Sequence, residues 1–172
     1  MNPNRYHLFT LAALTAMSGS ALCQDSKPLN LSIRVGQFQP AFSAARDEGR
    51  SWFAIGGDTR IKTLGVSSTN PGTSSYLTIS FDSYSKGDFR AMPILLNYVT
   101  RTNELYFSAG AGLTFAGERD DDEGDKTRVG FAFGVGYDFM QGRTPLFVEA
   151  KYFGNSSNDH LNGLAIFLGI RL

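Results

Sequence analysis

Residues 128–139, RVGFAFGVGYDF, alternate strictly between large apolar side chains and small or charged ones. The large side chains are those of Val129, Phe131, Phe133, Val135, Tyr137 and Phe139. A period of two predicts a β-strand whose side chains point alternately to two faces. Six bulky residues per strand would overfill the inside of a small barrel, so the bulky face is predicted to point outward into lipid. The segment therefore predicts a transmembrane β-strand, apolar outside and polar inside.

Similar alternation in other segments predicts eight strands. They are expected at about residues 29–38, 51–62, 76–84, 90–100, 105–115, 128–139, 146–153 and 163–172. Strands of roughly nine to eleven residues can cross a bilayer at a tilt. Pro93 predicts a bulge or a strand end, because proline cannot donate to a ladder. The predicted fold class is an all-β, eight-stranded antiparallel up-and-down transmembrane β-barrel, and a soluble lipocalin-like barrel is the alternative.

The connections between the predicted strands alternate in length, which indicates how the barrel is oriented. Long polar connections are expected at residues 39–50, 117–127 and 154–162, and short ones after the fourth and sixth strands. Outer-membrane barrels have long outer loops and short periplasmic turns. Residues 63–75 are rich in Ser, Thr, Gly, Asn and Pro and predict a turn, although a longer one than this rule expects. An even number of strands places both termini on one side.

The first residues have the features of a secretory signal. Arg5 and His7 flank the apolar run 8–17, and small residues follow. We expect a signal peptide at residues 1–23, with cleavage after residue 21 as the alternative, and a barrel domain at residues 24–172. A lipoprotein would need a small residue before Cys23, where Leu22 stands. The apolar run is too short to span a bilayer as a helix.

Composition narrows the classes of function. The chain has 172 residues, which predicts one domain, and its formal net charge of zero gives no indication of nucleic-acid binding. Cys23 is the only cysteine, so the sequence predicts neither a disulfide framework nor a thiolate metal site.

Three segments carry a resemblance to a known superfamily: LYFSAGAGLTF at 105–115, VGFAFGVGYDF at 129–139 and LFVEAKYF at 146–153, followed by the alternating last strand. Over about residues 29–172 the chain resembles the eight-stranded outer-membrane β-barrels, which include the membrane domain of outer membrane protein A and outer membrane protein X. One departure is the final residue, Leu172, where the family usually ends in an aromatic residue.

The resemblance implies a place and partners. The expected location is the bacterial outer membrane, reached after export across the inner membrane. Outer-membrane lipid and lipopolysaccharide are the expected neighbours, and the outer-membrane assembly machinery is expected to read the terminal strand. We expect a monomer, with no nucleic-acid partner and no cofactor.

Charged and polar side chains have lumen parity in this register. They are Arg34, Asp58, Arg60, Lys62, Asp82, Asn97, Arg101, Arg128, Asp138, Glu149, Lys151 and Arg171. Isolated buried charges are very costly, so these groups should be paired or hydrated. We predict a polar plug, with a small gated pore as the alternative. Arg34 and Asp58 lie at similar heights on neighbouring strands and are expected to touch, with Arg60 nearby. The predicted lumen network comprises Arg34, Asp58, Arg60, Asp138, Glu149 and Lys151.

Two other polar segments contain residue types that could carry chemistry. Ser156, Ser157 and His160, with Glu149 upstream, could form a hydrolytic site, because some eight-stranded barrels are lipid A deacylases. In those enzymes, His closely precedes Ser and a Glu follows, whereas here Ser precedes His and no acid follows. The acidic run 120–125 lacks the EF-hand order, and a solvated loop is expected rather than a divalent-ion site. We predict no catalytic residue and no metal site.

Aromatic residues near the predicted strand ends suggest girdles at the two membrane interfaces. Trp52, Tyr84 and Tyr152 are expected near the outer interface, and Tyr76, Tyr98, Tyr106 and Tyr137 near the inner one, although Trp52 and Tyr106 have lumen parity in this register. The predicted role is structural or surface interaction, without enzymatic activity. Narrow porin-like transport of small or apolar solutes is the alternative, and a lipid-modifying enzyme is a third class.

Overall fold

Eight strands and one short helix make up the described part of the chain. A computed structural model describes residues 30–47, 49–66, 72–87, 89–118, 126–139, 145–156 and 161–172. The elements are β1 (Leu31–Pro40), α2 (Ser43–Asp47), β2 (Trp52–Val66), β3 (Thr73–Lys86), β4 (Phe89–Thr102), β5 (Leu105–Glu118), β6 (Lys126–Asp138), β7 (Leu146–Asn155) and β8 (Gly163–Arg171). The predicted signal peptide, residues 1–23, lies outside the described residues. Within those ranges, no helix is long and apolar enough to cross a membrane.

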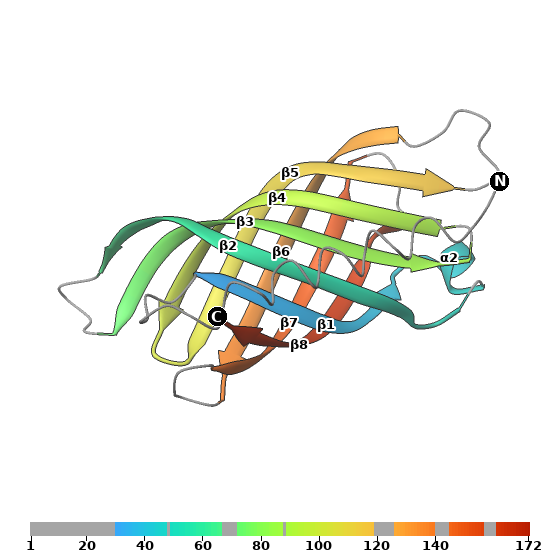
Figure 1. The fold of residues 1–172 in the computed structure, drawn as a ribbon. Helices are drawn as coiled ribbons and strands as arrows, with labels where there is room; N and C mark the ends of the chain where they lie inside the picture. The colour runs from blue at the N-terminus through green and yellow to red at the C-terminus, as the bar shows by residue number, and fades with distance from the viewer. Residues whose placement is uncertain are drawn as a thin grey trace, which may run out of the picture.

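The strands close into a barrel in sequence order (Figure 1). Each strand pairs antiparallel with its neighbour, and β1 also pairs with β8, with Ser32 opposite Arg171 and Pro40 opposite Gly163. The first and last strands therefore leave no open edge between them, as a sheet in lipid requires. The predicted eight-stranded antiparallel up-and-down barrel is confirmed.

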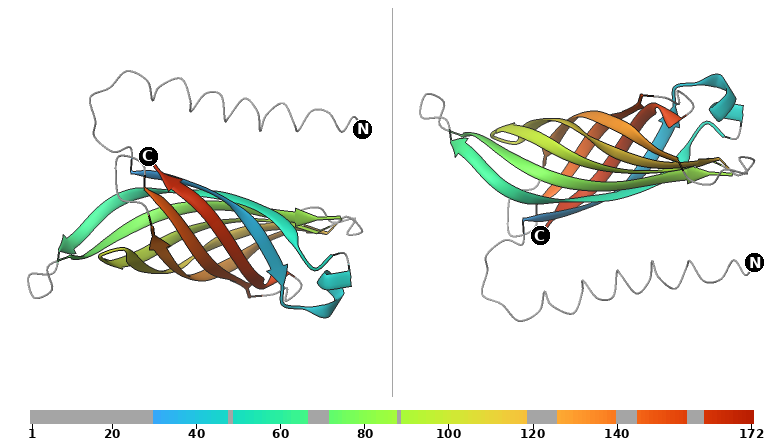
Figure 2. Two further views of the ribbon diagram at one scale, coloured as in Figure 1. Left: turned by 90° about the horizontal axis from the view of Figure 1, so that it is seen from below. Right: turned by 90° about the horizontal axis from the view of Figure 1, so that it is seen from above.

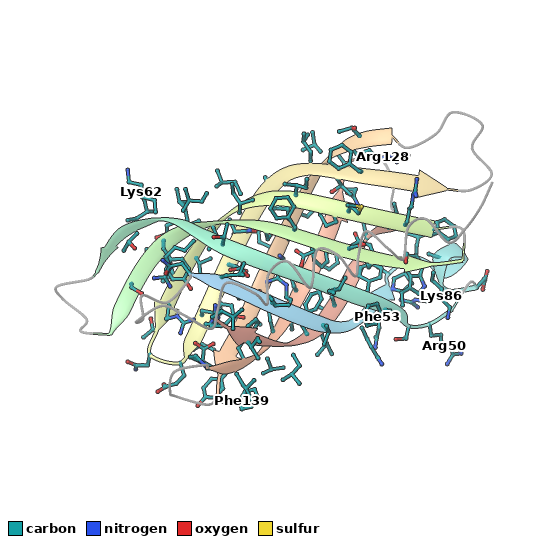
Figure 3. All side chains as sticks on the ribbon, in the orientation of Figure 1. Arg50, Phe53, Lys62, Lys86, Arg128 and Phe139 are labelled. Atoms are coloured by element: carbon teal, nitrogen blue, oxygen red, sulfur yellow. The ribbon has the colours of Figure 1, made fainter. Side chains whose placement is uncertain are left out.

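The apolar side chains face outward, as their alternation predicts. Val129 and Phe133 of β6 are 59% and 57% exposed, whereas Ala132 between them is 1% exposed. Exposed apolar residues also occur on the other seven strands, so the apolar band surrounds the barrel. Figure 3 shows Phe53 pointing out from the barrel wall, with Lys62 toward one end and Arg50 and Lys86 toward the other. An apolar outer band with charges at both ends fits a bilayer and disfavours the soluble lipocalin-like alternative.

Several strands are longer than the sequence predicted. The predicted turn at 63–75 is largely strand, because β2 continues to Val66 and β3 begins at Thr73. This ribbon extends beyond the ends of β1 and β8 (Figure 2), where β2 has register shifts at residues 60–62 and 63–65. This part of β2 has no β1 partner on its other side, so it is an open strand edge. The bulges and the exposed Lys62 hinder the pairing of this edge with another chain. The composition of residues 63–75 predicts a turn, because composition does not show that β3 supplies hydrogen-bond partners for the end of β2.

Two further expectations were wrong in detail. Pro93 causes neither a bulge nor a strand end: β4 continues through it, and the β3–β4 register is the same before and after the unpaired positions 92–93. Pro93 is paired with Thr114 of β5, so the missing donor interrupts only the ladder to β3. The predicted polar loop 39–50 contains helix α2, whose Ala45 is fully buried at that end of the barrel.

Large aromatic side chains fill part of the lumen, which corrects the predicted girdles. Trp52, Tyr76, Tyr84 and Tyr106 are 1–4% exposed and point inward, whereas Tyr98, Tyr137 and Tyr152 are on the outer face. Glycines on facing strands make the room. A Cβ on Gly136 would lie 2.1 Å from Cζ of Tyr106, and one on Gly169 would lie 2.3 Å from Cζ of Phe147. Each of these two glycines therefore leaves the space that an aromatic ring in the lumen occupies.

Candidate functional site: the barrel lumen

The lumen is filled by three layers of side chains. They lie between the end of the barrel that carries α2 and the opposite end, where β1 begins and β8 ends, which is called here the end with the strand termini. An aromatic cap lies at the α2 end and consists of Phe38, Trp52, Tyr84, Phe153 and Phe167. An ionic belt follows, formed by Arg34, Asp58, Asp82, Glu149 and Lys151. An arginine layer of Arg101, Asp138 and Arg171 is closest to the termini.

Arg34 is the centre of the ionic belt. Its Nη2 and Nε donate to Oδ1 of Asp82 at 2.7 and 2.9 Å, and its Nη1 donates to Oδ2 of Asp58 at 2.7 Å. The same Nη1 lies 3.2 Å from Oε2 of Glu149. Because the Arg34 side chain is only 2% exposed, these contacts supply the charge compensation that water would otherwise provide.

A glycine permits the contact between Arg34 and Asp82. Arg34 of β1 is level with Gly56 of β2, which is level with Asp82 of β3. A Cβ on Gly56 would lie 1.9 Å from Oδ1 of Asp82. The arginine therefore reaches across an intervening strand only because that strand carries hydrogen in place of a side chain.

The belt carries more negative than positive groups. Nζ of Lys151 donates to Oδ2 of Asp82 at 2.8 Å, so Asp82 is held by both cations of the belt. Arg34 and Lys151 face three carboxylates, which leaves one excess negative charge if all five groups are ionised. Oε2 of Glu149 has no hydrogen-bond partner among the described residues, although it is close to Arg34.

Asp138 belongs to a separate layer. Nη1 of Arg101 donates to its Oδ2, and Nε of Arg171 donates to its Oδ1 at 3.1 Å. The Arg171 guanidinium lies over the rings of Phe147 and Tyr106, 4.5 and 4.8 Å from their centroids. The Asp138 carboxylate thus binds two arginines at the end of the barrel with the strand termini.

The structure brings together some of the residues proposed from sequence. Arg34, Asp58, Glu149 and Lys151 lie in the ionic belt, with the expected Arg34–Asp58 contact present. Arg60 lies outside it: it is exposed, and its guanidinium stacks 3.9 Å from the centroid of Tyr76. The physical reason is that the β1–β2 ladder ends at Leu31 opposite Thr59, and the Arg60 N–H donates to the carbonyl of Asn30 just before β1, so Arg60 lies at the rim of the lumen.

Asp82, Arg101 and Arg171 have lumen parity in the sequence but are not part of the predicted network. Asp82 is fully buried and is the only belt carboxylate bound by both cations of the belt. The parity of Asp82 predicts that its side chain points into the lumen, but its height along the barrel axis depends on the β2–β3 register. Lumen parity combined with a glycine at the same level on the intervening strand is the signal that could have identified it.

The aromatic cap closes the α2 end. The Phe38 and Tyr84 rings stack with centroids 4.0 Å apart, and the Trp52 ring lies 5.3 Å from Phe38. The Tyr84 hydroxyl donates to the carbonyl of Leu161 at 3.0 Å, and Nε1 of Trp52 donates to the carbonyl of Gly49 at 2.9 Å. Each buried polar tip therefore has a partner.

Little space remains between the cap and the arginine layer. The interior cavity beside the ionic belt has a volume of about 20 Å³ and is lined by Arg34, Asn97, Glu149 and neighbouring polar residues. A water needs roughly 10–15 Å³, so this cavity is the size of one or two waters.

Only Glu149 and Ser156 of the proposed hydrolytic group lie within the residues that the structure describes. Glu149 is 3% exposed inside the barrel and lies close to Arg34. Ser157, His160 and the acidic run 120–125 lie outside the described residues. In the ranges that the structure describes, no group of three or more His, Cys, Asp or Glu residues could hold a metal ion.

Comparison with known proteins identifies the fold. No family model matches the sequence, and no curated protein matches it. Among solved structures, the outer membrane enzyme PagL is similar with a TM-score of 0.51 and 16% identity, covering 83% of this chain and 97% of PagL. The Yersinia pestis outer membrane protein Ail is similar with a TM-score of 0.51 and 12% identity, covering 83% of this chain and 98% of Ail. The chain therefore has the fold of the eight-stranded outer-membrane β-barrels.

Proposed function

We propose that this protein is a non-conducting barrel of the bacterial outer membrane with a structural or surface-interaction role and no enzymatic activity. The observation that carries the proposal is the filled lumen. The aromatic cap and the ionic belt occupy successive levels, and the cavity beside the belt is only about 20 Å³. Eight strands leave an interior just wide enough for side chains.

The orientation that fits the proposal places α2 outside the cell and both strand termini in the periplasm. Arg50 and Lys86 are exposed at the α2 end, close to the lipid-facing Phe53 (Figure 3). Basic side chains at that level would meet the phosphate groups of lipopolysaccharide. Lipopolysaccharide is therefore the proposed contact at this end, together with surfaces outside the cell that the loops meet. The outer-membrane assembly machinery is the proposed partner during insertion. We propose that the barrel acts as a monomer.

Planar-bilayer recording of the refolded protein tests the closed lumen. The wild-type barrel should give no discrete conductance steps. A Phe38→Ala/Tyr84→Ala variant thins the cap but keeps the ionic belt, so it should also remain closed. Regular conductance steps from the wild-type protein would overturn the proposal and favour narrow porin-like transport.

The absence of enzymatic activity needs a separate measurement. Lipid A is incubated with the folded barrel and analysed by mass spectrometry. We expect an unchanged lipid A mass, because Glu149 is engaged inside the lumen. Loss or gain of an acyl chain that depends on the folded protein would contradict the proposal.

A further inference from the structure

A second, larger pocket opens at the end of the barrel that carries the strand termini. It has a volume of about 230 Å³, and Ser32, Asp58, Arg60, Tyr76, Pro145 and Arg171 are among its lining residues. Asp58, Tyr76 and Arg171 also line the small cavity beside the ionic belt, so the two spaces are adjacent. The pocket is therefore a recess that opens at one end and is closed by the belt at the other.

Guanidinium donors around this recess exceed the available acceptors. Nη2 of Arg171 is buried without a hydrogen-bond partner among the described residues, and so are Nε and Nη2 of Arg101 in the same layer. Both arginines share the single carboxylate of Asp138. Buried donors without partners are costly, and cationic ones more so, which indicates that the site is completed by an acceptor.

Arg60 adds a third guanidinium at the rim of the recess. It stacks on Tyr76 at 3.9 Å and makes no ion pair with any residue that the structure describes. The acidic group in the recess, Asp58, is already engaged by Arg34 at 2.7 Å and by the Ser32 hydroxyl at 2.6 Å. Among the side chains that line the recess, the charge left to meet a ligand is therefore positive.

We propose that this recess binds an oxyanion of the phosphate class through Arg171 and Arg60. Planar guanidinium groups suit phosphate because their parallel N–H donors match its oxygens, and Tyr76 holds the Arg60 plane in place. The volume of about 230 Å³ accommodates a phosphomonoester or a phosphodiester headgroup as well as inorganic phosphate. Free phosphate and an anionic phospholipid headgroup offer the same chemistry at this end.

Inorganic phosphate is the probe for the test. The full mature chain, folded in neutral detergent, is titrated with phosphate or with sodium chloride at equal ionic strength, while the unfolding temperature is followed. A ligand that binds only the folded state raises this temperature in a saturable way. Phosphate should do so, and chloride should not.

The variants Arg60→Gln and Arg171→Gln should each weaken the phosphate response by about tenfold, as expected for one charge-assisted contact. Lys62→Gln is the matched control: Lys62 is an exposed cation on the same strand as Arg60, it is not among the residues that line the recess, and its variant should respond like wild type. Since Arg171 also holds Asp138, its replacement could impair folding. Arg60 is exposed and holds no other described side chain by an ion pair, so Arg60→Gln keeps the test decisive.

Nanodiscs distinguish the two sources of phosphate. If phosphatidylglycerol discs abolish the effect of added phosphate and phosphatidylcholine discs do not, an anionic headgroup occupies the recess. If both discs leave the effect intact, soluble phosphate or a soluble phosphoester is the ligand. An equal response to chloride and phosphate in the wild type, or an Arg60→Gln variant indistinguishable from Lys62→Gln, would overturn the proposal.

Discussion

Removing Arg34 should destabilise the barrel far more than removing the charge of Glu149. Replacement by Met keeps much of the side-chain volume but deletes all the contacts of Arg34 with Asp58, Asp82 and Glu149. Lys151 is then the only cation of the belt facing three carboxylates. Breaking a buried ion pair by deleting one partner costs about 3–5 kcal/mol. We expect the upper part of that range, because the variant leaves two excess negative charges.

Glu149→Gln is the matched comparison. It leaves two cations facing two carboxylates, and the Oε2 atom that changes has no hydrogen-bond partner among the described residues. The expected loss is therefore about 1 kcal/mol or less, the scale of a single net hydrogen bond. The sign of the difference follows from counting charges in the belt: losing a cation increases the imbalance, and losing a carboxylate removes it.

A double variant separates the pair from its surroundings. Arg34→Met/Asp82→Asn returns the belt to one excess negative charge, as in the wild type. It should lose less stability than the two single variants added together, with a coupling free energy of about 1–3 kcal/mol for groups in contact. The two residues are joined by hydrogen bonds of 2.7 and 2.9 Å, so they are close enough to couple.

Urea unfolding in phospholipid vesicles measures these free energies. Trp52 is the single tryptophan, it is 1% exposed in the aromatic cap, and its fluorescence reports loss of the folded lumen. Strictly additive losses would contradict the pairing of Arg34 with Asp82. A Glu149→Gln loss equal to or larger than the Arg34→Met loss would refute the charge argument itself.

Three further predictions concern the wall, the belt and strand closure. Phe133→Arg should cost about 2–4 kcal/mol if it lies at the bilayer midplane, whereas Phe53→Arg near the rim should cost about 0–1 kcal/mol; equal losses in vesicle unfolding would contradict the assigned depths. Gly56→Ala should cost about 1–3 kcal/mol, because the new Cβ would lie 1.9 Å from Oδ1 of Asp82, and an unchanged urea midpoint would be inconsistent with the packing. Deleting the last three residues should abolish the heat-modifiable band on gels, since β8 must pair with β1, whereas deleting residues 120–125, which lie outside the described residues, should not.

The sequence by itself determined the strands and their faces. Alternation is a local property, because successive side chains of a strand point to opposite sides whatever the neighbouring strands do. The outward direction of Phe133 and the inward direction of Ala132 could therefore be predicted from residues 128–139 alone. The even number of strands, both termini at one end and closure into a barrel also follow from local patterns and from the cost of unpaired backbone in lipid.

Only the tertiary structure decided which inward side chains meet. Contact in the lumen requires equal height as well as equal parity, and height depends on the register between strands. That register places Gly56 between Arg34 and Asp82 and leaves Arg60 beyond the end of β1, although Arg60 has the parity of Asp58. It also sets lumen aromatics against lumen glycines, as with Tyr106 and Gly136, because the volume of a closed barrel is shared between strands that are far apart in sequence.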